Sequence, residues 1–118
     1  QIKALLLDQR MLAGVGNIYA DESLFAAGIH PRAVAARLSP ARRRKLLAAM
    51  KDRLCEAIRK GGSTIRDYRD ATGQAGFFQL ALKVYGRSGT PCPACGQPIQ
   101  HNITAGRSTH FCARCQKK

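Results

Sequence analysis

The sequence predicts a mainly α-helical protein that ends in a small β-hairpin held by four cysteines. Three observations predict this fold class: helical spacing of apolar residues up to about residue 70, a glycine-rich stretch after it, and two Cys-x2-Cys pairs near the end. We expect three parts over residues 1–70, 71–90 and 91–118. A chain of 118 residues is long enough for one domain or two small ones.

The first two expected helices follow from apolar spacing and from residues that end a helix. Ile2–Gln9 places Ile2, Leu5 and Leu6 at helical spacing. A second helix is expected over residues 17–27, because Gly28 suits a left-handed end and Pro31 prevents continuation. Asp21 and Glu22 are expected in its first turn, where anions are favourable.

A third helix is expected to begin at Ser39-Pro40, because serine caps a helix and proline fits its first position. Gly61-Gly62 would end it, and a short helix would follow from Thr64. Cys55 lies between Leu54 and Ala57 on this helix, so we expect a thiol in the core. The apolar stripe of the helix comprises Leu47, Met50, Leu54 and Ile58.

The charge of the chain favours a polyanionic partner. Twenty Lys and Arg against seven Asp and Glu give a formal net charge of +13, and residues 71–118 contain six basic residues and no acidic one. Such a surface favours nucleic acid by counterion release and steering. No apolar run approaches the roughly 18 residues of a membrane span, and no leader is visible. The chain begins at Gln1 rather than Met, so we expect a piece of a longer protein.

The strongest motif is a metal-binding pattern of cysteines, comprising Cys92, Cys95, Cys112 and Cys115. Sixteen residues separate the two Cys-x2-Cys pairs, which is the spacing of a zinc ribbon. Four thiolates complete a tetrahedral shell, so one Zn²⁺ would be structural. Gly96 suits the positive φ of such a turn. There are two alternatives to zinc. Two disulfides would need an oxidising compartment and would leave Cys55 unpaired. An iron site with four sulfur ligands fits the same spacing.

A hairpin is expected between the cysteine pairs, with "PIQHNI" and "RSTHFC" flanking residues 104–106. The apolar residues expected behind the metal are Ile99, Ile103 and Phe111. Because four cysteines fill the shell, His101 and His110 are expected at the surface or facing DNA rather than as ligands. His30 is expected to belong to the turn before Pro31.

Several residues are candidates for binding a phosphate group. The GVGN stretch at 14–17 offers backbone N–H groups at a helix start, and Asn17 could cap that helix or donate its amide to a phosphate oxygen. Each candidate has a plainer interpretation: a turn for the glycines, a solvated side chain for Lys3, and a solvated first helical turn for the basic run at 42–45. Arg107 lies beside the expected hairpin tip.

Taken together, these motifs resemble one family over nearly the whole chain. "LLLDQRMLAGVGNIYADESLFAAGIHP", "GGSTIRDY", "FFQLALKVYGRSGTPCPACGQPI" and "GRSTHFCARCQ" follow one another as in the C-terminal half of formamidopyrimidine-DNA glycosylase, the bacterial base-excision repair enzyme for oxidised purines. Endonuclease VIII is a relative with the same architecture, but "GFFQLALKVYGR" is more similar to the former. The resemblance implies a helix–two-turn–helix bundle followed by a zinc ribbon with four cysteine ligands.

The resemblance also implies roles for particular residues. The family's contacts with the DNA backbone around the damaged nucleotide match Lys3, Asn17 (which follows Gly16) and Arg107. Tyr19 matches a residue of the base pocket. The loop over residues 71–80 would close over the everted purine. Its central residues are Thr72, Gly73, Gln74, Ala75, Gly76, Phe77 and Phe78.

One feature of the family has no counterpart in this sequence. Its nucleophile is an N-terminal proline followed by a glutamate, whereas this sequence opens with Gln1-Ile2. The resemblance therefore implies a monomeric DNA-binding part in the bacterial cytoplasm and nucleoid, whose partners are damaged duplex DNA and an N-terminal catalytic domain. Two alternatives remain: a stand-alone zinc-ribbon module that binds RNA, and an enzyme that uses Lys3 for Schiff-base chemistry.

Overall fold

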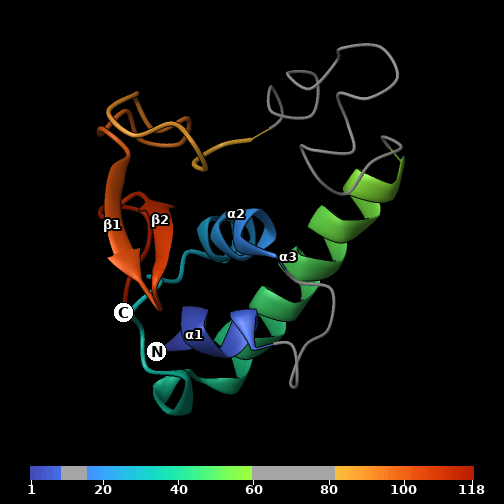
Figure 1. Cartoon of the computed structure of the whole chain (residues 1–118). Helices are drawn as coiled ribbons and strands as arrows, with labels where there is room; N and C mark the ends of the chain where they lie inside the picture. The colour runs from blue at the N-terminus through green and yellow to red at the C-terminus, as the bar shows by residue number, and fades with distance from the viewer. Residues whose placement is uncertain (9–15, 60–81) are drawn as a thin grey trace.

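The structure, a computed structural model, describes residues 1–8, 16–59 and 82–118. In chain order its elements are α1 (Ile2–Leu7), α2 (Asn17–Ala27), the 3-10 turn η1 (Ala35–Arg37), α3 (Pro40–Arg59), β1 (Gln100–Thr104) and β2 (Arg107–Phe111). In Figure 1, α2 lies between the hairpin and α3, and the two ends of the chain lie near the hairpin. The fold is mainly α with one antiparallel hairpin, as predicted.

Part of the expected structure lies outside the described residues. This applies to the Gly61-Gly62 helix end, the short helix from Thr64, and residues 71–81 of the loop and linker. Within the described ranges, no helix has the length and apolarity needed to cross a bilayer.

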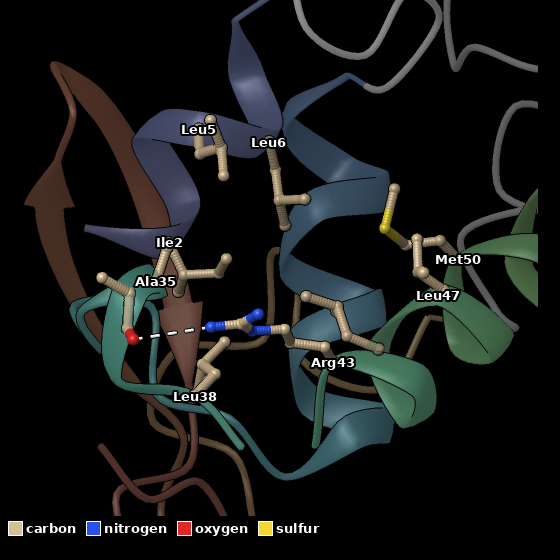
Figure 2. Close-up of a pocket in the computed structure, with 10 residues that line it drawn as sticks. Ile2, Leu5, Leu6, Ala35, Leu38, Arg43, Leu47 and Met50 are labelled. Carbon is tan, nitrogen blue, oxygen red and sulfur yellow. Dashed lines mark hydrogen bonds between the residues drawn. The ribbon is translucent and has the colours of Figure 1, made fainter. Parts of the chain in front are cut away.

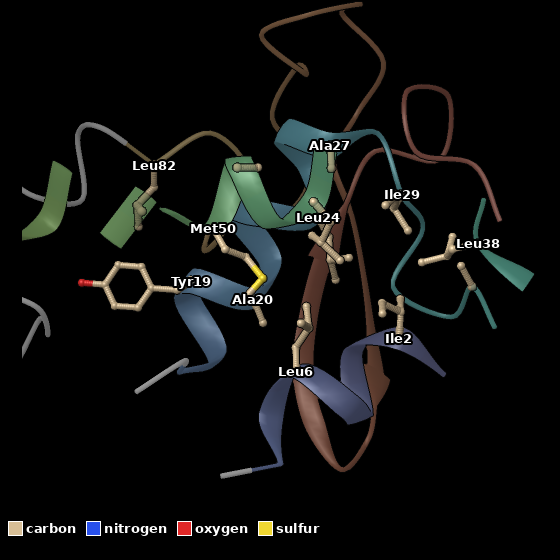
Figure 3. Packing of buried hydrophobic residues seen from close by; sticks show 13 residues of the cluster. Ile2, Leu6, Tyr19, Ala20, Leu24, Ala27, Ile29, Leu38, Met50 and Leu82 are labelled. Atoms are coloured by element: carbon tan, nitrogen blue, oxygen red, sulfur yellow. The ribbon is translucent and has the colours of Figure 1, made fainter. Parts of the chain in front are cut away.

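Helix α2 forms the centre of the fold. Eight of its eleven residues are buried, as expected for a helix that is covered on all sides. Leu24 and Ala20 of α2 pack with Leu6 of α1 and Met50 of α3 in one apolar core (Figure 3). The helix ends where the sequence predicts, because Gly28 adopts φ +71° and the Ile29 N–H donates to the Leu24 carbonyl at 3.0 Å.

Helix α3 begins as predicted, and its apolar stripe is partly as predicted: Met50 is buried, and Leu54 packs against the core. Its start is capped by Ser39 Oγ, which accepts the Arg42 N–H at 3.2 Å. The prediction for Leu47 is wrong, since it is 55% exposed, whereas its neighbour Leu46 is buried. The prediction for Cys55 is also wrong, because this thiol is exposed. Cys55 lies about 140° around the helix from the buried Met50, so it points away from α2.

An apolar groove of about 360 Å³ lies between α1, η1 and α3 (Figure 2). Ile2, Leu6 and Leu38 form its floor together with Leu46 and Met50. Leu5 and Leu47 also line the groove, and both are exposed. The described residues therefore do not fully cover the apolar faces of α1 and α3.

A buried ion pair joins α1, α2 and β2. Lys3 Nζ lies 2.7 Å from Asp21 Oδ1, and both side chains are fully buried. The same ammonium donates to the Thr109 hydroxyl at 2.7 Å and to the Ser108 carbonyl at 3.1 Å. The other Asp21 oxygen accepts the His110 N–H at 2.9 Å. Two side chains from the helices therefore fix three consecutive residues of segment 91–118, which holds both Cys-x2-Cys pairs and which we call the finger.

Glu22 performs a similar function one residue later. Its carboxylate accepts the backbone N–H groups of Lys83, Val84 and Tyr85 at 2.8–2.9 Å. The expectation that Asp21 and Glu22 lie in the first turn is wrong: α2 begins at Asn17, and no acidic residue lies in its first turn. Both carboxylates are buried and hold distant backbone, which is a stronger reason for their presence than the helix dipole.

The end of the finger returns to the end of α2. Gln116 is 1% exposed; its amide donates to the Ile29 carbonyl at 2.9 Å, and its oxygen accepts the Cys112 N–H at 2.7 Å. Lys117 and the Gly28–His30 segment exchange backbone hydrogen bonds at 2.9 and 3.0 Å. A Cβ on Gly28 would lie 3.4 Å from the Cys115 carbonyl, an ordinary contact distance, so the positive φ of the helix end is what favours glycine here. The helices and finger form one packed unit.

The buried pair provides a stability prediction. We expect Lys3→Met and Asp21→Asn each to lower the free energy of unfolding by about 3–5 kcal/mol, because each leaves the other charge buried without its partner. The double variant leaves no buried charge, so it should cost less than the sum of the two single changes. Urea unfolding of the zinc-loaded chain measures all four species, and additive costs would contradict the pairing.

Candidate nucleic-acid interface and metal centre

The four cysteines of the finger converge on one point. The Sγ atoms of Cys92, Cys95, Cys112 and Cys115 all lie within 4.8 Å of one another. The Cys92–Cys115 and Cys95–Cys112 sulfur distances are 3.9 and 3.5 Å. Sulfurs bound to one tetrahedral zinc at about 2.3 Å are about 3.8 Å apart, whereas a disulfide requires about 2.0 Å. The arrangement fits a four-sulfur metal site and excludes the two-disulfide alternative.

The two Cys-x2-Cys turns present their sulfurs to the metal in the same way. The Ala94 N–H donates to Cys92 Sγ at 3.3 Å, and the Cys115 N–H donates to Cys112 Sγ at 3.4 Å. Gly96 has φ +84°, which confirms the predicted need for glycine there. Such N–H groups stabilise thiolates, which are the form that binds metal.

The thiols have widely separated pKa values because they share one small volume. Burial and hydrogen bonds from the three neighbouring thiols raise the pKa of Cys115 to about 12. At Cys92 burial also raises the pKa, but backbone N–H groups of Ala94 and Cys95 outweigh it and lower the pKa to about 7. Four thiolates would therefore repel one another unless a cation lies between them. The donor set fits Zn²⁺, which would hold the two turns together with no open coordination position.

The hairpin differs from the prediction at its tip. Thr104 is the last residue of β1, so the turn is the two-residue pair Ala105-Gly106. Both residues have positive φ, +56° and +74°, which is the pattern of a type I′ turn.

The small core behind the metal is only partly as expected. Ile99 packs there with Val84, as predicted for Ile99. Phe111 is also buried, and its ring meets His30 edge to face at 4.7 Å. Ile103 is 57% exposed, so its expected place in this core is wrong. Ile103 precedes the buried Thr104 on β1, and successive side chains of a strand point to opposite faces, so Ile103 lies on the open face of the hairpin.

Asn17 and the finger tip lie side by side. The Asn17 side-chain amide donates to the Ser108 carbonyl at 3.0 Å, and Ser108 directly follows Arg107. Asn17 is 8% exposed, and an amide nitrogen carries two N–H groups, of which this bond uses one. Gly16 is the exposed N-cap of α2, and among the described residues no atom lies within 4 Å of a Cβ built on it. We call Gly16, Asn17, Arg107 and Ser108 the tip site.

Lys3 and Tyr19, the other predicted DNA-binding residues, are buried, as Asn17 is. Lys3 lies beside the tip site, bound to Asp21, Ser108 and Thr109 as described above. Burial lowers the pKa of its amine, and the nearby charge of Arg107 lowers it further. Tyr19 is 7% exposed and belongs to the apolar core. The structure thus brings Lys3 to Asn17 and Arg107, while its contact with DNA stays a prediction, as does the role of Tyr19.

The remaining candidates have mixed outcomes. Residues 72–78 of the predicted loop lie outside the described residues. His110 was expected at the surface, but it is 9% exposed and packs against Tyr85, with ring centroids 5.0 Å apart. Its backbone bond to Asp21 draws it inward. His30 behaves as predicted, since its Nδ1 accepts the Arg32 N–H at 3.0 Å within the turn.

The sequence interpretation missed the residues that join the finger to the helices. Asp21, Glu22 and Gln116 are all at most 3% exposed and make these contacts. The available signal was the pair of acids inside an otherwise apolar helix in a strongly basic chain, because buried charges need partners. No local pattern identifies partners that lie 61 or more residues away.

Comparison with known proteins agrees with this geometry. Residues 1–69 match the family described as "Formamidopyrimidine-DNA glycosylase H2TH domain". Residues 89–118 match "Zinc finger found in FPG and IleRS". The two matches lie on either side of the glycine-rich stretch.

Individual relatives give the same result. The chain is 54% identical over 118 residues to the formamidopyrimidine-DNA glycosylase of Solibacter usitatus (strain Ellin6076), covering 100% of this chain and 45% of that protein. It resembles the crystal structure of the MutM (Fpg) protein from Thermus thermophilus with TM-score 0.84 and 51% identity, over 97% of this chain and 44% of that one. A complex of Lactococcus lactis Fpg with abasic-site DNA gives TM-score 0.88 and 43% identity, over 100% and 42%.

The chain spans less than half the length of these relatives. The match to the helical family nevertheless covers more than half of this chain, and the second match covers the finger. The chain therefore belongs to the formamidopyrimidine-DNA glycosylase family, and its four cysteines form the site of one structural zinc ion.

Proposed function

We propose that this chain is the DNA-binding and lesion-clamping part of a base-excision repair glycosylase and AP lyase that acts on oxidised purines. The observation that carries the proposal is the bond from Asn17 to Ser108, which holds the start of α2 against the residue that follows Arg107. A helix start offers free N–H groups and partial positive charge, and arginine suits phosphate. Together they provide one anion site from two parts of the chain.

This site suits a repair protein. Phosphate contacts position a protein on DNA without reading sequence, and lesions arise in any sequence. Everting a base costs a few kcal/mol, and backbone contacts around the lesion offset part of that cost by holding the duplex bent. The relative from Lactococcus lactis was solved with abasic-site DNA, which supports duplex DNA with an oxidised purine or abasic site as the partner.

We place the chemistry in a partner domain. No residue of this chain matches the N-terminal proline and glutamate of the family, so we assign no catalytic residue here. The zinc site has no open position and would only support the finger. In this proposal the chain acts as a monomer in the bacterial cytoplasm and nucleoid, together with an N-terminal catalytic domain. The contacts of Asp21 and Gln116 favour this function over a stand-alone zinc ribbon, because they merge the finger with the helices.

Replacing either tip-site side chain tests the proposal. We expect Asn17→Ala and Arg107→Ala each to weaken binding to abasic-site duplex by about 1–3 kcal/mol, the loss of a hydrogen bond to a charged group. Fluorescence anisotropy at fixed salt measures the affinity. Arg114→Ala is the matched control, since Arg114 is an exposed arginine in the second cysteine turn. Equal affinities for all three variants would refute the tip site.

Metal removal tests the role of the finger. A chelator should collapse the amide signals of residues 91–118 in an NMR spectrum, because this segment has too small a core to fold alone. The affinity for abasic-site duplex should fall in parallel, since Arg107 would lose its position, and added Zn²⁺ should restore both. An unchanged finger spectrum after complete zinc removal would contradict this account.

A further inference from the structure

A second cationic site lies on another part of the surface. A pocket of about 220 Å³ forms where the segment after α2, the start of α3 and the end of the chain meet. Its polar lining consists of Arg32, Arg37, Arg42 and Lys118, which we call the basic pocket. Val34 and Leu38 complete the wall, and no acidic side chain of the described residues lines it.

Two of these cations are fixed by the fold. The Arg32 guanidinium donates to the Thr104 hydroxyl at 3.1 Å and to the Ile103 carbonyl at 2.9 Å. The Arg42 guanidinium donates to the Lys117 and Lys118 carbonyls at 2.7 and 3.3 Å. Each guanidinium has five N–H groups, so both keep donors for a ligand. Their positions are set before any ligand arrives, which lowers the entropy lost on binding.

The side chains of the other two cations, Arg37 and Lys118, are not held by the fold. In the part of the chain that the structure describes, no hydrogen bond or ion pair occupies the side chains of Arg37 and Lys118, and both are exposed. A terminal carboxylate on Lys118 would offset one charge beside Arg42 and leave the pocket cationic. Burial lowers the pKa of the adjacent His30, and the charges of Lys118 and Arg32 lower it further, in keeping with a positive field.

We propose that the basic pocket binds a phosphodiester group of the DNA backbone, as a contact separate from the tip site. The two sites share the hairpin: Arg32 binds the last two residues of β1, and Thr104 is paired with Arg107. A duplex held at Arg107 therefore passes close to the pocket. Arginine suits phosphate because its planar donors match two oxygens at once. This inference rests on the proposed function, and it adds a binding site to it.

The test uses the salt dependence of binding to a duplex. Each phosphate contact contributes about −0.9 to the slope of log K against log salt. We expect the double variant Arg37→Gln/Lys118→Gln to bind abasic-site duplex several-fold more weakly, with a slope shallower by about one such contact. Arg32 and Arg42 are left intact, because their carbonyl bonds hold the finger. Unfolding curves of the variant should match the wild type.

The control is Arg44→Gln/Lys51→Gln, which removes the same charges from exposed positions on α3. Both positions lie about 160–180° around the helix from Arg42, away from the pocket. If the pocket variant and this control gave the same slope of log K against log salt, the inference would be overturned. If Asn17→Ala still weakened binding in that case, the proposed function would stand without the pocket.

A second probe separates DNA from a free anion. Inorganic phosphate is titrated into the labelled chain while the amides of Arg37 and Arg42 are followed by NMR. Two results together support the inference: chemical shift changes at these amides that vanish in the pocket variant, and a shallower salt slope when that variant binds duplex. Phosphate binding with an unchanged slope on duplex would assign the pocket to a free anion and overturn it. A wild-type chain that fails to bind duplex would overturn the proposed function as well.

Discussion

The arrangement of this protein depends on a buried ion pair between Lys3 and Asp21. Neither group is accessible to water, and together they bind three consecutive residues of β2, from Ser108 to His110. Burial raises the pKa of Asp21 to about 6, although Lys3 and the His110 N–H act against this. Burying both charges is therefore costly, and we infer that the pair serves mainly to fix one position of the finger.

The other contacts between the helices and the finger extend this constraint. Glu22 holds the backbone that leads into the finger, and Gln116 with Lys117 holds the backbone that leaves it. The metal closes the finger on itself, and α2 determines where the closed finger lies. These contacts hold α2 against the finger, so that Asn17 lies beside Ser108, the residue that follows Arg107. This arrangement is what would let Asn17 and Arg107, ninety positions apart in the chain, form the proposed anion site.

The parts of this structure that follow local rules were predictable from the sequence. The cysteine spacing located the metal site, and a glycine with a following proline located the end of α2. The packing of α3 was harder, because Leu46 and Leu47 are adjacent leucines and periodicity alone did not decide which is buried. The predicted burial of Cys55 and Ile103 was wrong for a related reason, since burial depends on which face of an element its neighbours cover.

The partners of Asp21 and Glu22 were beyond prediction because they are backbone groups of distant segments. A backbone N–H carries no sequence signature, so the acids could be noticed but not assigned. Their adjacency in α2 is now explained by geometry: neighbouring helical positions point about 100° apart, and one carboxylate reaches β2 while the other reaches residues 83–85. The charge of the chain indicated nucleic acid, whereas these two buried acids position the segments that carry the proposed contacts.

The central claim is that the Lys3–Asp21 pair makes Asn17 and Arg107 act as one site. A double-mutant cycle of Asn17→Ala and Arg107→Ala, measured as affinity for abasic-site duplex, tests it when it is run in both the wild-type and the Asp21→Asn background. The account predicts a clear coupling energy between the two side chains in the wild-type background and its loss in Asp21→Asn with zinc still bound. The same coupling energy in both backgrounds would contradict the claim.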